Sequence, residues 1–187
     1  MKTIIQMVVV LTVISIISAI ALSEISSWAN PKIAQNRAKE TEKAIFRVQP
    51  KAKSYKKINQ SGLELFQVFD ENNKPLGYVL TYEGNGFQGK IRLIVGLNDS
   101  LNVISRVEIL EQVETPGLGN KITEEPFLKQ FENLLTIPEI EWVKGSKPTK
   151  PNQIQTITAA TISSKSVVQI LNEGISKLKD LKQKGLL

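Results

Sequence analysis

Two apolar runs separated by a polar turn, Leu63-Glu-Leu-Phe-Gln-Val-Phe69 and Leu76-Gly-Tyr-Val-Leu-Thr-Tyr82, decide the fold class of this chain. Both runs are rich in the aromatic and aliphatic residues that favour strands. The segment between them, Glu71-Asn-Asn-Lys-Pro75, consists of residues that are typical of turns. The pattern predicts a β-hairpin, and because a short turn joins its strands, the surrounding sheet is expected to be antiparallel.

Two further strands are expected downstream of this hairpin. Residues 90–95 and 103–110 are apolar runs, and the turn segments 84–86 and 98–100 precede them. The spacing G-x-G-x-x-G within residues 84–89 matches a dinucleotide-binding fingerprint, but strand-like rather than helical residues follow it. Without a helix N-terminus there is no pyrophosphate site, so we interpret this segment as a hairpin turn and a strand entry.

Helices are expected beside the sheet. Residues 124–135 have a helical pattern with Thr123 as the expected N-cap, and residues 140–143 form an expected short strand. After a loop at 145–152, a final helix is expected from about Ser163, with apolar residues at helical spacing: Val167, Ile170, Leu171, Ile175, Leu178 and Leu181. The predicted fold class is therefore α+β, a mainly antiparallel sheet packed with helices.

The N-terminal segment carries the pattern of a membrane helix. Residues 3–23 contain no charged residue and are rich in Ile, Val and Leu, and about 20 helical residues span the roughly 30 Å of a bilayer core. A cleaved signal peptide is the alternative, because Ala19-Ile20-Ala21 resembles a cleavage site, but the apolar region of such a peptide is only about 7–15 residues long. We predict an uncleaved transmembrane helix, whose orientation the flanking charges do not decide.

The composition excludes several kinds of chemistry. The 187 residues include no cysteine and no histidine, which removes disulfides, thiolate metal sites, cysteine nucleophiles and every imidazole base or ligand. The net charge is +6, but only 6% of residues are aromatic and they are not interleaved with arginine, so nucleic-acid binding is not expected. An organic cofactor that brings its own chemistry is compatible with this composition.

Two stretches are candidate functional sites. Glu114-Thr-Pro-Gly-Leu-Gly119 follows the fourth strand, and its glycines allow backbone to approach a ligand, although a plain strand-to-helix connection has the same composition. Residues 156–164, Thr-Ile-Thr-Ala-Ala-Thr-Ile-Ser-Ser, place five hydroxyl groups at the start of the last helix. One hydroxyl is enough for an N-cap. Several of them, with Lys165 one turn into the helix, make a candidate anion site.

Together these two stretches resemble the signature of the G subunit of the Rnf electron-transport complex and of the homologous C subunit of the sodium-pumping quinone reductase. Residues 114–119 match the family's Glu-Thr-Pro-Gly-Leu-Gly motif, and Thr158-Ala-Ala-Thr161-Ile-Ser-Ser164 is similar to its flavinylation motif, usually written Ser/Thr-Gly-Ala-Thr. Residues 77–78 and 89–96 also resemble the family's sheet. The likeness covers essentially the whole chain, including the N-terminal helix.

The resemblance implies a covalent flavoprotein. In the family, a separate flavin transferase joins FMN through its phosphate to the last threonine of the motif, so Thr161 is the expected attachment residue. The expected cofactor-binding residues are Thr158, Ala159, Ala160, Ser163 and Ser164 around the attachment point, and Glu114, Thr115, Gly117 and Leu118 along the isoalloxazine. No metal site is expected, and no catalytic residue apart from the flavin.

The resemblance also implies a cellular role. It predicts a single-pass subunit in the inner membrane of a prokaryote, with the flavin domain on the extracytoplasmic side and the other subunits of an Rnf-type complex as partners. Such a complex moves electrons between ferredoxin and NAD, coupled to Na⁺ or H⁺ transport, and this chain would catalyse no complete reaction on its own. The expected domains are a transmembrane anchor at 1–23, a juxtamembrane helix and basic linker at 24–57, with Pro31 as a kink or turn, and a covalent FMN-binding domain at 58–187.

Three departures from the motifs and two alternative functions accompany this prediction. Gln112 and Val113 replace a histidine that is often found before the Glu-Thr of the first motif. Ala159 stands where the family usually has glycine, and it would cost about 1 kcal/mol or more if that position needs a positive φ. Gln155 replaces an aspartate that is common upstream of the motif. The alternatives are a stand-alone extracytoplasmic flavin-domain protein that serves another reductase or regulator, and a cofactor-free tethered binding module whose hydroxyl cluster is only a helix cap.

Overall fold

The computed structural model describes residues 1–59 and 62–187, which form two compact units, residues 1–40 and 41–187. Helix α1 (Lys2–Val48) begins in the first unit and ends in the second. Its apolar stretch is exposed, and among the described residues α1 is the one helix that is long and apolar enough to cross a membrane. Pro31 lies inside this continuous helix, where a proline bends the axis without ending the helix.

The second unit is built on an antiparallel sheet of five strands in chain order, β1 (Ser54–Ile58), β2 (Glu64–Phe69), β3 (Pro75–Asn85), β4 (Lys90–Asn98) and β5 (Ile104–Glu111). The strands expected from the apolar runs are confirmed as β2 to β5. The segment expected to be a basic linker contains β1, which pairs with β2. The lysines of β1 obscure its pattern, because only Tyr55 and Ile58 are partly buried.

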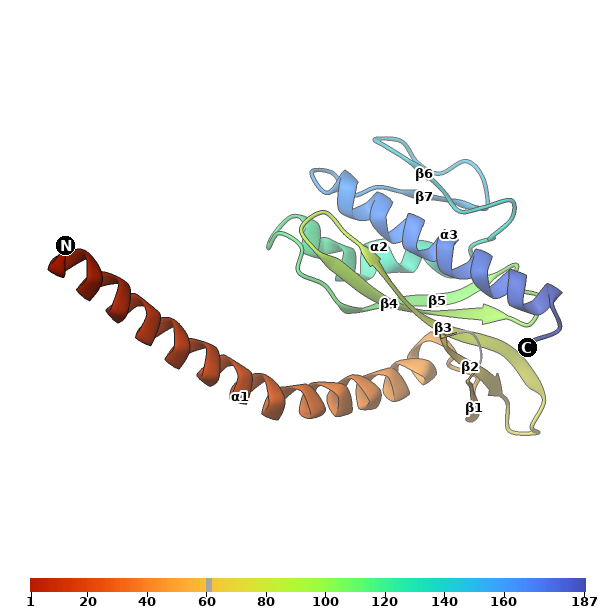
Figure 1. Ribbon diagram of the computed structural model, residues 1–187. Helices are drawn as coiled ribbons and strands as arrows, with labels where there is room; N and C mark the ends of the chain where they lie inside the picture. The colour runs from red at the N-terminus through yellow and green to blue at the C-terminus, as the bar shows by residue number, and fades with distance from the viewer. Residues whose placement is uncertain (60–61) are drawn as a thin grey trace. The chain divides into compact units, whose positions relative to one another are not determined.

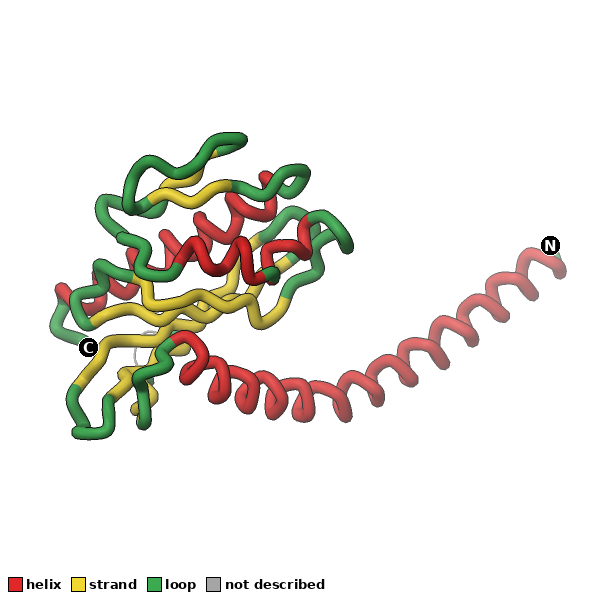
Figure 2. The backbone as a smooth tube through the Cα atoms, turned by 180° about the vertical axis from the view of Figure 1, so that it is seen from behind, coloured by secondary structure: helices red, strands yellow, loops and turns green. Residues whose placement is uncertain are grey.

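Helices cover both faces of this sheet (Figures 1 and 2). On one face α3 (Thr161–Gln183) closes a core cluster that includes Leu65 and Leu93. On the opposite face the last turns of α1 form a second cluster with the neighbouring strand residues, whose side chains point the other way; Phe66 and Ile94 are among them. The α1 residues in this second cluster are Ala44, Ile45 and Val48. The sheet is therefore buried on both sides, and the predicted α+β class is confirmed.

The prediction of one helix over residues 124–135 is wrong in its extent. The four-residue helix α2 (Glu125–Leu128) and the 3-10 helix η2 (Lys129–Phe131) occupy this region, and another 3-10 helix, η1 (Gly119–Thr123), precedes it. The expected N-cap is also wrong, because Thr123 Oγ1 donates to the backbone oxygen of Asn120 at 2.9 Å and no side chain caps α2. The helical pattern ends at Phe131 since Asn133 and Leu134 form backbone hydrogen bonds with Ile104 at the start of β5.

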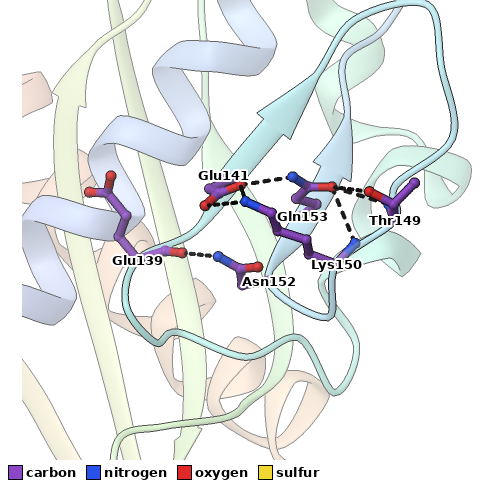
Figure 3. A network of polar contacts seen from close by, with 6 residues as sticks. All are labelled: Glu139, Glu141, Thr149, Lys150, Asn152 and Gln153. Carbon is purple, nitrogen blue, oxygen red and sulfur yellow. Dashed lines mark hydrogen bonds and ion pairs between the residues drawn. The ribbon is translucent and has the colours of Figure 1, made fainter.

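A second, two-stranded sheet pairs β6 (Glu141–Val143) with β7 (Gln153–Gln155) in parallel. Strand β6 matches the short strand expected at 140–143, whereas no apolar run predicts β7. Figure 3 shows the contacts that hold the loop between them, in which Glu141 Oε2 accepts hydrogen bonds from Lys150 Nζ at 2.8 Å and Gln153 Nε2 at 2.7 Å. These contacts fix the start of β6, and the other end of this strand leads into Lys144 and Gly145, which line the cleft described next.

Candidate functional site

A cleft of about 560 Å³ lies at the end of the sheet where β3 turns into β4. In Figure 1 the β3–β4 turn, the loop after β5 and the start of α3 gather at this end of the sheet. Small-molecule sites have volumes of roughly 300–1,000 Å³, so the cleft is large enough for a cofactor. Its lining residues are Phe87, Thr115, Leu118, Gly119, Lys144, Gly145, Thr156, Thr158, Ala159, Ala160, Thr161, Ile162 and Ser163.

Thr161 is the first residue of α3 and lies in the wall of this cleft, half-buried. The cap position before it belongs to Ala160, and no side chain makes a capping hydrogen bond there. The interpretation of the hydroxyl cluster as a simple N-cap therefore has no support in the geometry. The first N–H groups of α3 and the Thr161 hydroxyl lie at the positive end of a 23-residue helix, which favours an anion.

Ala159 has a left-handed backbone, with φ of +66°. This is the conformation for which glycine is best suited, and it costs an L-residue about 1–2 kcal/mol. From the sequence, alanine is expected to be costly at this position only if the backbone needs a positive φ, and the structure shows that it does. The strained turn places both Thr158 and Thr161 in the cleft wall.

The loop after β5 contributes a second wall, formed by Thr115, Leu118 and Gly119. The backbone oxygen of Thr115 accepts hydrogen bonds from the N–H groups of Leu118 and Asn120, both at 3.2 Å, which closes the loop on itself. Gly117 supplies the positive φ, +76°, that this tight turn requires. The structure thus brings together the two sequence motifs, which are about 40 residues apart in the chain.

Three of the expected site residues lie behind the wall or beside it. Gly117 is exposed and is not among the described lining residues. Ser164 is fully buried, where its Oγ donates to the backbone oxygen of Ala160 at 2.9 Å and accepts from the N–H of Ile157 at 3.0 Å. Glu114 is buried beneath the loop and forms hydrogen bonds with Phe87, Gln88 and Ser163.

The cleft also contains residues that the sequence did not single out. Phe87, at the tip of the β3–β4 turn, and Lys144, just after β6, have no local signal that marks them as part of a site. Lys165, which was a candidate for phosphate binding, instead places its Nζ 3.8 Å from the centre of the Trp142 ring, and it is not among the described residues that line the cleft.

Thr156 contributes a buried polar atom behind the wall of the cleft. Its side chain lines the cleft and is 5% exposed, yet its Oγ1 has no hydrogen-bond partner. A buried hydroxyl without a partner costs about 1–3 kcal/mol. The cleft also combines apolar side chains, such as Phe87, Leu118 and Ile162, with hydroxyl groups and a helix N-terminus. An isoalloxazine with a phosphate fits this combination, and the described residues include no cluster of three or more potential metal ligands.

Comparisons with known proteins agree with this chemistry. Residues 86–176 match the model of the FMN-binding domain. The chain is 28% identical to the G subunit of the ion-translocating oxidoreductase complex of Methanosarcina acetivorans over 184 residues, which cover 93% of this chain and 94% of the relative. It is 29% identical to the G subunit of the proton-translocating ferredoxin:NAD(+) oxidoreductase complex of Clostridium ljungdahlii, over 90% of this chain and 88% of the relative.

Solved structures support the fold. The crystal structure of NqrC from Shewanella oneidensis has a TM-score of 0.57 at 21% identity, over 68% of this chain and 67% of that one. The C subunit of the Na(+)-translocating NADH-quinone reductase from Parabacteroides distasonis has a TM-score of 0.54 at 24% identity, over 61% and 59% of the two chains. Residues 86–176 therefore match the FMN-binding domain family, and the chain as a whole is similar to the G subunits of ion-translocating oxidoreductase complexes.

Proposed function

We propose that this chain is the membrane-anchored electron-carrier subunit of an Rnf-type ion-translocating ferredoxin:NAD oxidoreductase complex, with FMN joined through its phosphate to Thr161 Oγ1. The observation that carries the proposal is the position of Thr161, whose side chain lies in the cleft of an FMN-binding domain at a helix start without a side-chain cap. The flavin would supply one- and two-electron transfer without help from cysteine or histidine, neither of which the chain contains.

The residues of the cleft have distinct roles toward this cofactor. The positive end of α3 stabilises the phosphate charge, and the ammonium group of Lys144 adds a second positive charge at the wall. Phe87, Leu118 and Ile162 present apolar surface to the isoalloxazine, since each lines the cleft and is also exposed.

Attachment requires a flavin transferase and a flavin nucleotide that carries an activated phosphate. Thr161 Oγ1 forms the new bond to phosphorus, the bond from phosphorus to the leaving nucleotide breaks, and the hydroxyl proton passes to a base of the transferase. The resulting ester keeps the cofactor at high effective concentration in the cleft. This matters most in the membrane topology that we propose, in which residues 1–23 anchor the chain and the flavin domain is extracytoplasmic.

The test is to express the full chain with a flavin transferase, denature it, and examine the gel band for flavin fluorescence and the intact chain for added mass. The wild type and Thr158→Ala should carry one FMN, because Thr158 lines the same wall without being the attachment residue. Thr161→Ala should carry none, and a fluorescent Thr161→Ala band would contradict the assignment. Purification from native membranes then distinguishes a member of a complex, which brings other membrane subunits with it, from a stand-alone flavin protein.

A further inference from the structure

Glu114 connects three parts of the cleft wall, although its own side chain lies behind that wall. Its Oε1 accepts hydrogen bonds from the backbone N–H groups of Phe87 at 2.8 Å and Gln88 at 3.1 Å, both in the β3–β4 turn. Its Oε2 accepts a hydrogen bond from the hydroxyl of Ser163 in the first turn of α3. One carboxylate therefore joins the hairpin tip, the loop after β5 and the start of α3.

Gly119 lies next to this carboxylate and also lines the cleft. A Cβ atom added there would lie 2.9 Å from Glu114 Cβ and 3.0 Å from Glu114 Oε2, which is tighter than side-chain contacts normally allow. The absence of a side chain at this position lets the wall approach the carboxylate closely. The Glu114 carboxylate thus lies directly behind two residues that line the cleft, Gly119 and Ser163.

This charge is buried and has no cationic partner. Glu114 is 4% exposed, and among residues 1–59 and 62–187 no lysine or arginine forms an ion pair with it. Two backbone N–H groups donate to Oε1 and the Ser163 hydroxyl bonds to Oε2, so a carboxylate at this position can accept all three hydrogen bonds. Because solvent screens a buried charge weakly, its influence on a neighbouring group is stronger than that of a surface charge.

We propose that Glu114 is a positioning residue whose buried negative charge lowers the reduction potential of the flavin held in the cleft. The inference rests on the proposed function and deepens it. Reduction adds negative charge to the flavin, so a fixed anion behind the wall raises the free energy of the reduced cofactor relative to the oxidised one. The hydrogen bonds from Phe87, Gln88 and Ser163 keep that anion in one place.

Potentiometric titration of the full flavin-loaded chain in detergent tests this inference. Glu114→Gln has nearly the same shape but no charge, and its midpoint potential should be higher than that of the wild type. Glu71→Gln is the matched control, because it removes the same charge from the exposed turn at the other end of β3, where the Glu71 side chain is 76% exposed. A Glu114→Gln midpoint equal to the wild-type value, or an equal rise in Glu71→Gln, overturns the inference.

Ser163→Ala is the second variant and decides the matter if Glu114→Gln fails to fold or to acquire flavin. It removes the donor to Oε2 and leaves the carboxylate charge less compensated, so the midpoint potential should fall. An unchanged or higher midpoint contradicts the inference. Flavin content, measured by absorbance and intact mass, separates the two levels of the argument, because a wild type without covalent flavin refutes the proposed function itself.

Discussion

Replacing Ala159 with glycine should stabilise the domain. The left-handed φ of +66° costs alanine about 1–2 kcal/mol relative to the right-handed conformations. Glycine removes this strain but gains freedom in the unfolded chain, which opposes folding by about 0.5–1 kcal/mol. The Ala159 side chain is exposed, so its loss removes no buried apolar surface. The net expectation is a gain of about 0.5–1 kcal/mol in the free energy of unfolding. In a domain of this size, each 1 kcal/mol raises the Tm by roughly 2–4 °C.

Urea unfolding of the flavin-free chain in detergent, followed by circular dichroism of the sheet, measures this gain. Ala160→Gly is the matched control at the next residue, where φ is −129° and the side chain is 5% exposed. Glycine relieves no strain there and removes a buried methyl group, so this variant should lose about 1 kcal/mol or more. If Ala159→Gly is destabilised to the same degree as Ala160→Gly, the reasoning from backbone strain is wrong.

Three other contacts lead to predictions of their own. Thr156→Val replaces the unpaired hydroxyl with a methyl group and should raise the free energy of unfolding of the flavin-free chain by about 1 kcal/mol. Thr156→Ser keeps the hydroxyl and should bring no such gain, and urea titration of both variants measures the difference. A chain that begins at Thr41 should keep the fold. A chain that begins at Lys51 loses Ala44, Ile45 and Val48 from the core, and the lost burial of Ile45 and Val48 lowers the free energy of unfolding by roughly 3–6 kcal/mol. This loss should appear as a lower urea midpoint. The hydrogen bond from Lys150 lowers the pKa of Glu141 below its ordinary 4.5. The contribution of this contact to stability is therefore complete above pH 4.5 and is lost as the pH falls through the lower pKa of the folded state. NMR titration of the Glu141 side chain should show a higher pKa in Lys150→Gln than in the wild type.

The sequence predicted the elements whose signals are local and missed those that depend on distant partners. Strands β2 to β5 are apolar runs between turns, so their extents could be predicted closely from the chain itself. Strand β1 has exposed lysines, and it is a strand because Tyr55 packs edge-to-face on Phe66 while its backbone pairs with β2. The helical pattern at 124–135 was broken by pairing of Asn133 and Leu134 with Ile104, a contact that no local pattern reveals.

The same distinction applies to the site. Its two motifs were visible in the sequence through their resemblance to a family, and the structure brings them into one cleft. Phe87 and Lys144 were not predicted, because each reaches the cleft through the position of its strand rather than through its neighbours in the chain. Thr156 was visible as one of several hydroxyls, but only the packing around it distinguishes an unpaired hydroxyl from a paired one such as that of Ser164.

The division of the hydroxyl groups at the start of α3 explains why the motif contains several of them. Ser164 bonds to the backbone of Ala160 and Ile157 and fixes the turn before the helix. Ser163 donates to Glu114 and ties the helix to the other motif. Since neither hydroxyl caps the helix, the first N–H groups of α3 stay available to an anion, and Thr161 stands beside them in the cleft. A single capping hydroxyl would satisfy one of these groups from within the chain, so the cluster suits phosphate attachment better than it suits a helix cap.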